Sequence, residues 1–201
     1  MADEILSPPR KALISRKTGE TDIRLELDLD GNGNHAIDSG VPFLDHMLTL
    51  FTVHGLFNMR LEAEGDTEVD DHHTVEDIGI CLGQAFASSL GDKGGILRYG
   101  SCLMPMDETL VRVVVDLSNR PYLHYDVPVA DQKLGTFDTC LAKEFVRAFC
   151  QHAGVTLHID LLHGENSHHI IEAVFKALAR AMREAVTPRA GGGVMSSKGC
   201  L

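Results

Sequence analysis

Two copies of a His-His-x-x-Glu motif could bind metal ions. The first is HHTVE at residues 72–76, and the second is HHIIE at residues 168–172. In a helix, residues three and four apart share a face, so each motif would present imidazole and carboxylate groups around one turn. Adjacent imidazoles diverge by about 100° around a helix axis. Each pair would therefore face two different metal ions, with further ligands supplied by the other copy.

Imidazole with carboxylate suits Mn, Fe, Ni, Zn or Co, and the ligand types alone do not choose among these metals. A paired His motif could instead only line a helix beside an acidic surface, and a single copy would leave that interpretation open. Two copies at equivalent places favour metal binding. The residue order also differs from the ExxH motif of di-iron bundles and from the HExxH motif of metalloproteases.

Hydrophobic periodicity and turn residues predict the elements that carry these motifs. The Asp-Gly-Asn-Gly-Asn stretch at residues 30–34 is a strong hairpin-turn signal. The expected strands are residues 10–17, 21–29, 57–64, 96–103, 109–117, 122–129 and 155–162. The expected helices are residues 42–55, 71–90, 138–152 and 166–186.

The two halves of the chain align with each other. Residues 46–54 match residues 144–152, which sets Phe51 over Phe149, and the two HHxxE motifs then coincide in the same order of elements. We therefore predict an α+β fold made by internal duplication of a β-rich half with two helices packed against sheets. The expected parts are residues 1–93, residues 94–187, and a flexible glycine-containing tail at residues 188–201.

Composition excludes several partners. The net charge of −11, the absence of Trp and the presence of only three Tyr argue against nucleic acid. Apolar runs fall short of the roughly 20 residues that cross a bilayer, so no membrane partner is expected. The first residues lack the apolar core of a signal peptide, which favours a cytoplasmic protein, or a plastid one if the source is a plant. The five Cys show no CxxC spacing and are expected to be reduced thiols.

Beyond these patterns, several segments resemble the imidazoleglycerol-phosphate dehydratase family, from about Arg16 to the C-terminus. They are FLDHM at 43–47, DDHHTVED at 70–77, SNRPY at 118–122, TLHI at 156–159, GENSHHIIEAVFKA at 164–177 and SSKG at 196–199. The resemblance implies halves of the ribosomal-S5-domain-2-like type. It also implies a hydro-lyase of L-histidine biosynthesis that converts D-erythro-imidazoleglycerol phosphate to imidazole-acetol phosphate through an imidazolate held by two manganese ions (Mn2+). Family members form homo-oligomers of 24 subunits, built from trimers, with active sites shared between subunits.

The resemblance implies two sets of metal ligands. Many family members have His at the position of Glu144; the internal alignment sets Glu144 opposite His46, which suits a ligand. Whether this carboxylate binds metal directly, binds through water or is only a solvated surface group is open at this stage. One set is His46, His73, Glu76 and His169. The other set is His72, Glu144, His168 and Glu172.

The reaction must take a proton from a weakly acidic carbon and help a hydroxyl group leave, which calls for acid and base groups. Glu172 is one candidate base and Glu20, in TGET, is the second, and their roles cannot be assigned from sequence; Glu76 is the third carboxylate placed among the catalytic candidates. The resemblance assigns the substrate to Glu20, His54, Arg98, Arg120, Lys176, Ser196, Ser197 and Lys198. Of these, the Arg, Ser and tail Lys residues are expected to hold the phosphate, with the glycine-rich tail closing over it.

Two other functions compete with the dehydratase. One is a different di-metal enzyme, such as a hydrolase or an oxygenase, which would not need the phosphate-binding cations Arg98, Arg120 and Lys198. The other is a non-catalytic metal-binding shell protein, which would not need Glu20 or the SSKG tail.

Overall fold

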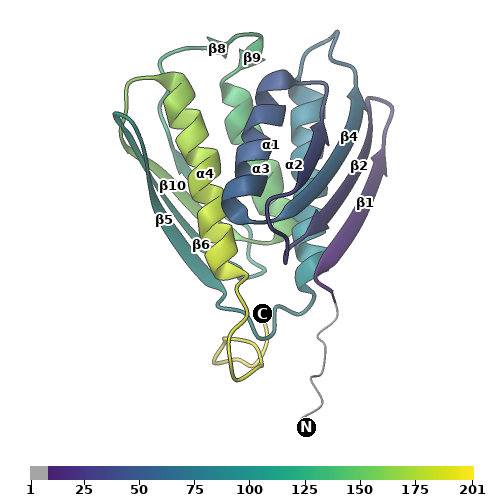
Figure 1. Cartoon of the computed structure of the whole chain (residues 1–201), viewed down its shortest axis with the longest axis vertical. Helices are drawn as coiled ribbons and strands as arrows, with labels where there is room; N and C mark the ends of the chain where they lie inside the picture. The colour runs from purple at the N-terminus through teal and green to yellow at the C-terminus, as the bar shows by residue number, and fades with distance from the viewer. Residues whose placement is uncertain (1–8) are drawn as a thin grey trace.

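Alternation of apolar and polar residues builds two sheets, each with one buried face. Along β2 (Thr21–Asp28) and β6 (Thr109–Asp116), every second residue is buried and those between are partly or fully exposed. In the computed structural model, which describes residues 9–201, the two sheets enclose a layer of four helices (Figure 1). The first sheet has the order β1-β2-β4-β3, with β1 at Lys11–Lys17, β3 at His35–Asp38 and β4 at Asn58–Gly65. The second has the order β5-β6-β10-β7, with β5 at Tyr99–Met106, β7 at Tyr122–Asp126 and β10 at Thr156–His163.

The helices pack in pairs from opposite halves of the chain. They are α1 (Pro42–Gly55), α2 (His72–Leu90), α3 (Cys140–Ala153) and α4 (Ser167–Ala185). Helix α2 lies against α3, and α1 lies against α4. Glycine permits the closer approach: a Cβ at Gly79 of α2 would stand 2.7 Å from the carbonyl oxygen of Phe145 in α3. Helix α4 begins at Asn166, whose side chain accepts from the backbone amides of His168 and His169.

Both halves have the same topology, as the internal alignment predicts. In each sheet the last strand in chain order is inserted between the second and third strands, and it runs parallel to the third: β4 pairs with β3, and β10 with β7. Phe51 and Phe149, which the alignment equates, meet in the core with ring centroids 6.5 Å apart. The α+β class and all four predicted helices are confirmed, with ends that differ by at most two residues.

Four local features differ from the predictions. The turn signal at residues 30–34 does not make a hairpin, because β4 lies between β2 and β3. Strand β3 follows that turn where no strand was expected, and a small hairpin of β8 (Lys133–Leu134) and β9 (Phe137–Asp138) was also missed. Strand β5 begins three residues later than predicted, because Arg98 donates its backbone amide to Ala185 at the end of α4 and Leu97 donates to Thr187 just beyond it.

None of the helices in residues 9–201 has the length and hydropathy needed to cross a bilayer. Most of the N-terminal stretch considered as a signal peptide lies outside the described residues. The five Cys are free thiols, as expected, with Cys81 and Cys150 buried and Cys200 exposed.

Candidate active site

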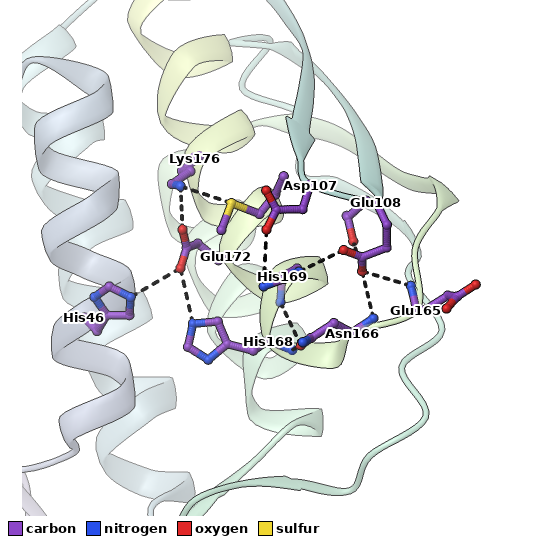
Figure 2. Close-up of polar contacts among 11 residues, drawn as sticks. His46, Asp107, Glu108, Glu165, Asn166, His168, His169, Glu172 and Lys176 are labelled. Carbon is purple, nitrogen blue, oxygen red and sulfur yellow. Dashed lines mark hydrogen bonds and ion pairs between the residues drawn. The ribbon is translucent and has the colours of Figure 1, made fainter.

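Helices α1 and α4 bring one cluster of metal-type ligands together (Figure 2). Nε2 of His46 lies 3.3 Å from Oε2 of Glu172, and Nε2 of His168 lies 3.2 Å from the same oxygen. One ligand atom from each of these three residues falls within 4.8 Å of the others. Lys176 contacts the second oxygen of Glu172. Burial raises the pKa of Glu172, but hydrogen bonding and charge from Lys176, with the two imidazoles, bring it below its ordinary value.

Helices α2 and α3 carry the residues that the internal alignment equates with these, one helix from each half. Nε2 of His72 lies 3.7 Å from Oε2 of Glu76. Arg147 of α3 stands 3.3 Å from Oε1 of Glu76 and 2.5 Å from Oε2 of Glu144. The internal alignment equates Glu144 with His46. This cluster therefore has one imidazole and two carboxylates, whereas the first has two imidazoles and one carboxylate. The guanidinium of Arg147 lies between the two carboxylates. In the first half, the position equivalent to Arg147 is Thr49.

The second His of each motif is oriented by a carboxylate. Nδ1 of His73 is 3.0 Å from Asp66, and Nδ1 of His169 is 2.9 Å from Oε2 of Glu108. These hydrogen bonds raise the pKa of both imidazoles. Metal-binding His residues usually donate their other ring N–H to such a carboxylate, which fixes the tautomer. The arrangement leaves Nε2 of each ring available as a ligand.

Glu108 is itself held rigidly. Its Oε1 accepts from the backbone amides of Glu165, at 3.2 Å, and Asn166, at 2.9 Å. Together with His169, these donors hold the pKa of Glu108 far below its usual range. From sequence alone, Glu108 could have a role near the site or be only a turn residue, and no pattern indicates Asp66. A usable signal is present, because Glu20-Thr21 and Glu108-Thr109 occupy equivalent turns of the two halves. Glu20 also reaches its own half's motif, with Oε1 3.8 Å from Nε2 of His73.

The predicted phosphate-binding residues meet in a second place, a cavity of about 640 Å³. Arg98 is buried there and donates to both oxygens of Asp116, at 2.6 and 3.0 Å, and to the carbonyl of Met195 at 2.6 Å. The hydrogen bond to Asp116 raises the pKa of Arg98 further. The lining includes Arg98, Tyr99, Arg120, Ser196, Ser197 and Lys198. All five residues predicted to hold the phosphate are therefore brought together.

This cavity and the ligand cluster lie at opposite ends of α4. His168 is in the first turn of the helix, whereas the backbone amide of Arg98 donates to the carbonyl of Ala185 at its last residue. At roughly 1.5 Å per residue, the two ends are about 25 Å apart. Figure 1 shows the tail below the yellow end of α4, away from its green N-terminal end. His54, in the last turn of α1, is half-buried, and burial lowers its pKa.

The contacts within one chain join residues that the resemblance assigned to different metal ions. His46 lies with His168 and Glu172, although the predicted sets put His46 with His73, Glu76 and His169. Those sets describe an assembly in which several chains contribute ligands, and they stay a prediction.

Comparison with known proteins decides the family. The sequence profile described as imidazoleglycerol-phosphate dehydratase matches residues 39–182. The chain belongs to the imidazoleglycerol-phosphate dehydratase family. It is 65% identical to the imidazoleglycerol-phosphate dehydratase of Desulfotalea psychrophila over 98% of this chain and 99% of the relative. It is 60% identical to that of Pelobacter propionicus over 96% and 99% of the two chains.

Solved structures of imidazoleglycerol-phosphate dehydratases have the same fold. The Staphylococcus aureus enzyme superposes with a TM-score of 0.81 at 46% identity, covering 89% of this chain and 99% of the other. The Pyrococcus furiosus enzyme, solved in complex with (S)-C348, superposes with a TM-score of 0.82 at 42% identity, covering 94% and 100%. The resemblance inferred from the motifs is thus confirmed, and the chain is an enzyme of the dehydratase class.

Proposed function

We propose that this chain removes water from imidazoleglycerol phosphate to give imidazole-acetol phosphate, a step of L-histidine biosynthesis, with two Mn2+ ions as cofactors. Family membership supports the substrate. The observation that supports metal binding is that Nδ1 of His73 and Nδ1 of His169 each contact a carboxylate. Such a partner is typical of imidazoles whose Nε2 binds a metal.

The donor set fits a first-row divalent ion. Two imidazoles and one carboxylate converge at His46, His168 and Glu172 without a thiolate, which suits manganese and its neighbours. Bound there, the ions would act as Lewis acids that favour the anionic form of the substrate's imidazole ring, from whose adjacent carbon the hydroxyl leaves.

The three candidate catalytic glutamates differ in how free their carboxylates are. Both oxygens of Glu172 are engaged, one by Lys176 and the other by two imidazoles. Glu76 is engaged by Arg147 and faces His72. The side chain of Glu20 is 56% exposed, and its one ion-pair contact within residues 9–201 is with Nε2 of His73, at 3.8 Å. We therefore assign proton transfer at the substrate carbon to the carboxylate of Glu20, and metal binding to Glu76 and Glu172.

The phosphate is assigned to the cavity beside the C-terminal tail. Asp116 orients the buried guanidinium of Arg98, which presents fixed donors, while Arg120 is 67% exposed and can turn toward an anion. The hydroxyls of Ser196 and Ser197 and the ammonium of Lys198 add further donors from the tail. Closure of this tail over the substrate stays part of the proposal.

A complete site would need more than one chain. A small substrate cannot bridge about 25 Å between the two ends of α4. The imidazole-binding end of one subunit must therefore meet the phosphate-binding end of another. This supports the proposal of a homo-oligomer with shared active sites, for which the family resemblance implies 24 subunits.

The direct test adds Mn2+ and imidazoleglycerol phosphate to the purified chain and follows formation of imidazole-acetol phosphate by its ketone. We expect product in the presence of Mn2+ and a large loss of rate after chelation. Metal-loaded protein that forms no product would disprove the proposed activity and would favour the metal-binding shell protein.

Sharing of sites is tested by mixing two variants. Glu20→Gln removes a group at the metal end, and Arg120→Ala removes one at the phosphate end. Each should be nearly inactive alone. Dissociating and reassembling them together should restore on the order of a quarter of wild-type activity, from random pairing of variants across an interface. A mixture no more active than its components would argue that each site lies within one chain.

A further inference from the structure

Three strained backbone positions meet beside the phosphate cavity. Lys93, Arg98 and Asn119 have φ of 60°, 73° and 56°, in the left-handed region that residues other than glycine rarely adopt. Strain of this kind persists where the surroundings over-determine the conformation, and it is frequent at functional sites. A hydrogen bond joins two of them, since Nζ of Lys93 donates to Oδ1 of Asn119 at 2.5 Å. Arg98 contacts the same loop through its carbonyl, which accepts from the amide of Leu117 at 3.1 Å.

Lys93 is the least expected of these residues, because it is only 2% exposed. Its ammonium also donates to the carbonyl of Ala153, at the end of α3, at 3.3 Å. Burial lowers the pKa of Lys93 to about 8, opposed by the charge of Asp116 and assisted by that of Arg98. Burying an ammonium is unfavourable unless its hydrogen bonds are made. The two acceptors therefore fix the position of this side chain.

The cap of α3 closes around the same contact. Gly154 has φ of 64°, and a Cβ there would stand 3.2 Å from Oδ1 of Asn119 and 3.8 Å from Nζ of Lys93. Oδ1 of Asn119 thus lies between a helix end and a buried ammonium, although the residue as a whole is exposed. These two neighbours fix the position of that oxygen.

Asn119 is followed directly by Arg120, a candidate phosphate ligand. Hydrogen bonds hold the loop around it: the amide of Arg120 donates to Oγ of Ser118 at 3.1 Å, and Oγ1 of Thr156 in β10 donates to the carbonyl of Arg120 at 2.9 Å. The backbone at Arg120 is therefore fixed while its guanidinium is exposed at the cavity. Because Asn119 directly precedes Arg120, its conformation helps to set the direction in which the Arg120 side chain leaves the loop.

We propose that Lys93 is a positioning residue for the phosphate site, acting through Asn119 to aim Arg120 into the cavity. This inference rests on the proposed function, in which the cavity takes the phosphate of the substrate. It assigns to Lys93 no contact with the substrate.

The test uses two competitive probes of the assembled, Mn2+-loaded enzyme, inorganic phosphate for one end of the site and imidazole for the other. The variants are Lys93→Met, which removes the donor, and Asn119→Gly, which removes the acceptor but tolerates the left-handed backbone. Lys11→Met, an exposed lysine that pairs with Asp28, is the matched control. We expect inhibition by phosphate to weaken about three- to tenfold in both variants, as for loss of one positioned hydrogen bond, with inhibition by imidazole unchanged.

Inhibition by phosphate should be no weaker in the double variant than in either single variant, because both substitutions remove the same contact. Equal weakening toward both probes would mean a merely structural role and would overturn the proposal, as would phosphate inhibition equal to that of Lys11→Met. If Lys93→Met does not fold, Asn119→Gly carries the test alone. If the wild-type enzyme turns over substrate and phosphate inhibits the variants as strongly as the wild type, only the role of Lys93 is refuted. If phosphate does not inhibit the wild-type enzyme, the phosphate site itself is refuted.

Discussion

Oε2 of Glu108 accepts a hydrogen bond from Nδ1 of His169 at 2.9 Å, while Oε1 of the same carboxylate accepts from two backbone amides before α4. Both oxygens are thereby committed. The carboxylate joins the β5–β6 turn to the start of the helix that carries the second HHxxE motif. It sets the tautomer and ring orientation of His169 before any metal binds.

Glu108→Ala should therefore weaken Mn2+ binding even though Glu108 is not a ligand. Loss of a carboxylate that orients a metal-binding His typically costs about 10- to 100-fold in metal affinity. Titration calorimetry with Mn2+ measures the effect. Glu165→Gln is the matched control, because Glu165 contributes only its backbone amide to this contact. Affinity equal to that of the control would show that His169 needs no such partner, or that it is not a ligand.

Metal removal should also dissociate the oligomer if metal ligands come from several chains. His72→Ala combined with His168→Ala removes the first His of each motif and should lower both metal content and oligomer mass. Native mass spectrometry before and after chelation of the wild type measures the same effect without substitution. An oligomer of unchanged mass after complete chelation would contradict the prediction.

Much of the fold was predictable because its determinants are local. The helix at residues 42–55 follows from its apolar spacing and from Pro42 at its first turn, and α4 follows from Asn166 as its cap. The turn at residues 30–34 was misread because Asp-Gly and Asn-Gly specify only a local chain reversal. Insertion of β4 between β2 and β3 depends on where α1 returns the chain, which no local signal records.

Proximity of the candidate site residues was predictable within one helix but not between elements. The spacing of each HHxxE motif requires that Glu172 share a helix face with His168, and the structure agrees. The approach of His46 to Glu172 depends on how α1 crosses α4. The separation of Arg98 from His168 depends on the length of α4 and on its packing against β5 and β6. Such relations between distant elements are fixed by packing, which the sequence pattern alone does not contain.

Glu144 makes the two clusters of this chain chemically unequal, because it replaces an imidazole with a carboxylate that Arg147 contacts. Glu144→Gln should weaken one of the two Mn2+ sites about tenfold, as expected when a charged ligand or its neighbour is neutralised, and leave the other unaffected. A two-phase Mn2+ titration resolves the sites. Glu26→Gln, on an exposed strand position paired with Arg24, is the control. Two unchanged phases would identify Glu144 as a solvated surface residue.

Close packing of α2 on α3 should make Gly79 intolerant of even a methyl group. In an exposed helix, Gly→Ala would stabilise by about 1 kcal/mol. Here the new Cβ would stand 2.7 Å from the backbone oxygen of Phe145, and relieving that overlap should cost about 1–3 kcal/mol. The thermal midpoint of Gly79→Ala should therefore fall relative to Gly19→Ala, whose Cβ meets nothing within 4 Å. A midpoint for Gly79→Ala at or above that of the control would contradict this packing.

Lys93 should make stability rise with pH above about 8. Its pKa is about 8 in the folded chain against an ordinary value of 10.5, so between these values the unfolded chain holds a proton that the folded chain has released. Stability increases with pH wherever the unfolded state binds more protons, and this pKa difference corresponds to roughly 3 kcal/mol. Cys81 and Cys150 act in the opposite direction, because burial raises the pKa of each thiol to about 11. The difference between wild type and Lys93→Met isolates the lysine, since both proteins retain the two thiols. Denaturant unfolding from pH 7 to 10.5 should show the wild type gaining stability relative to the variant, and parallel curves would mean that Lys93 titrates at its ordinary pKa.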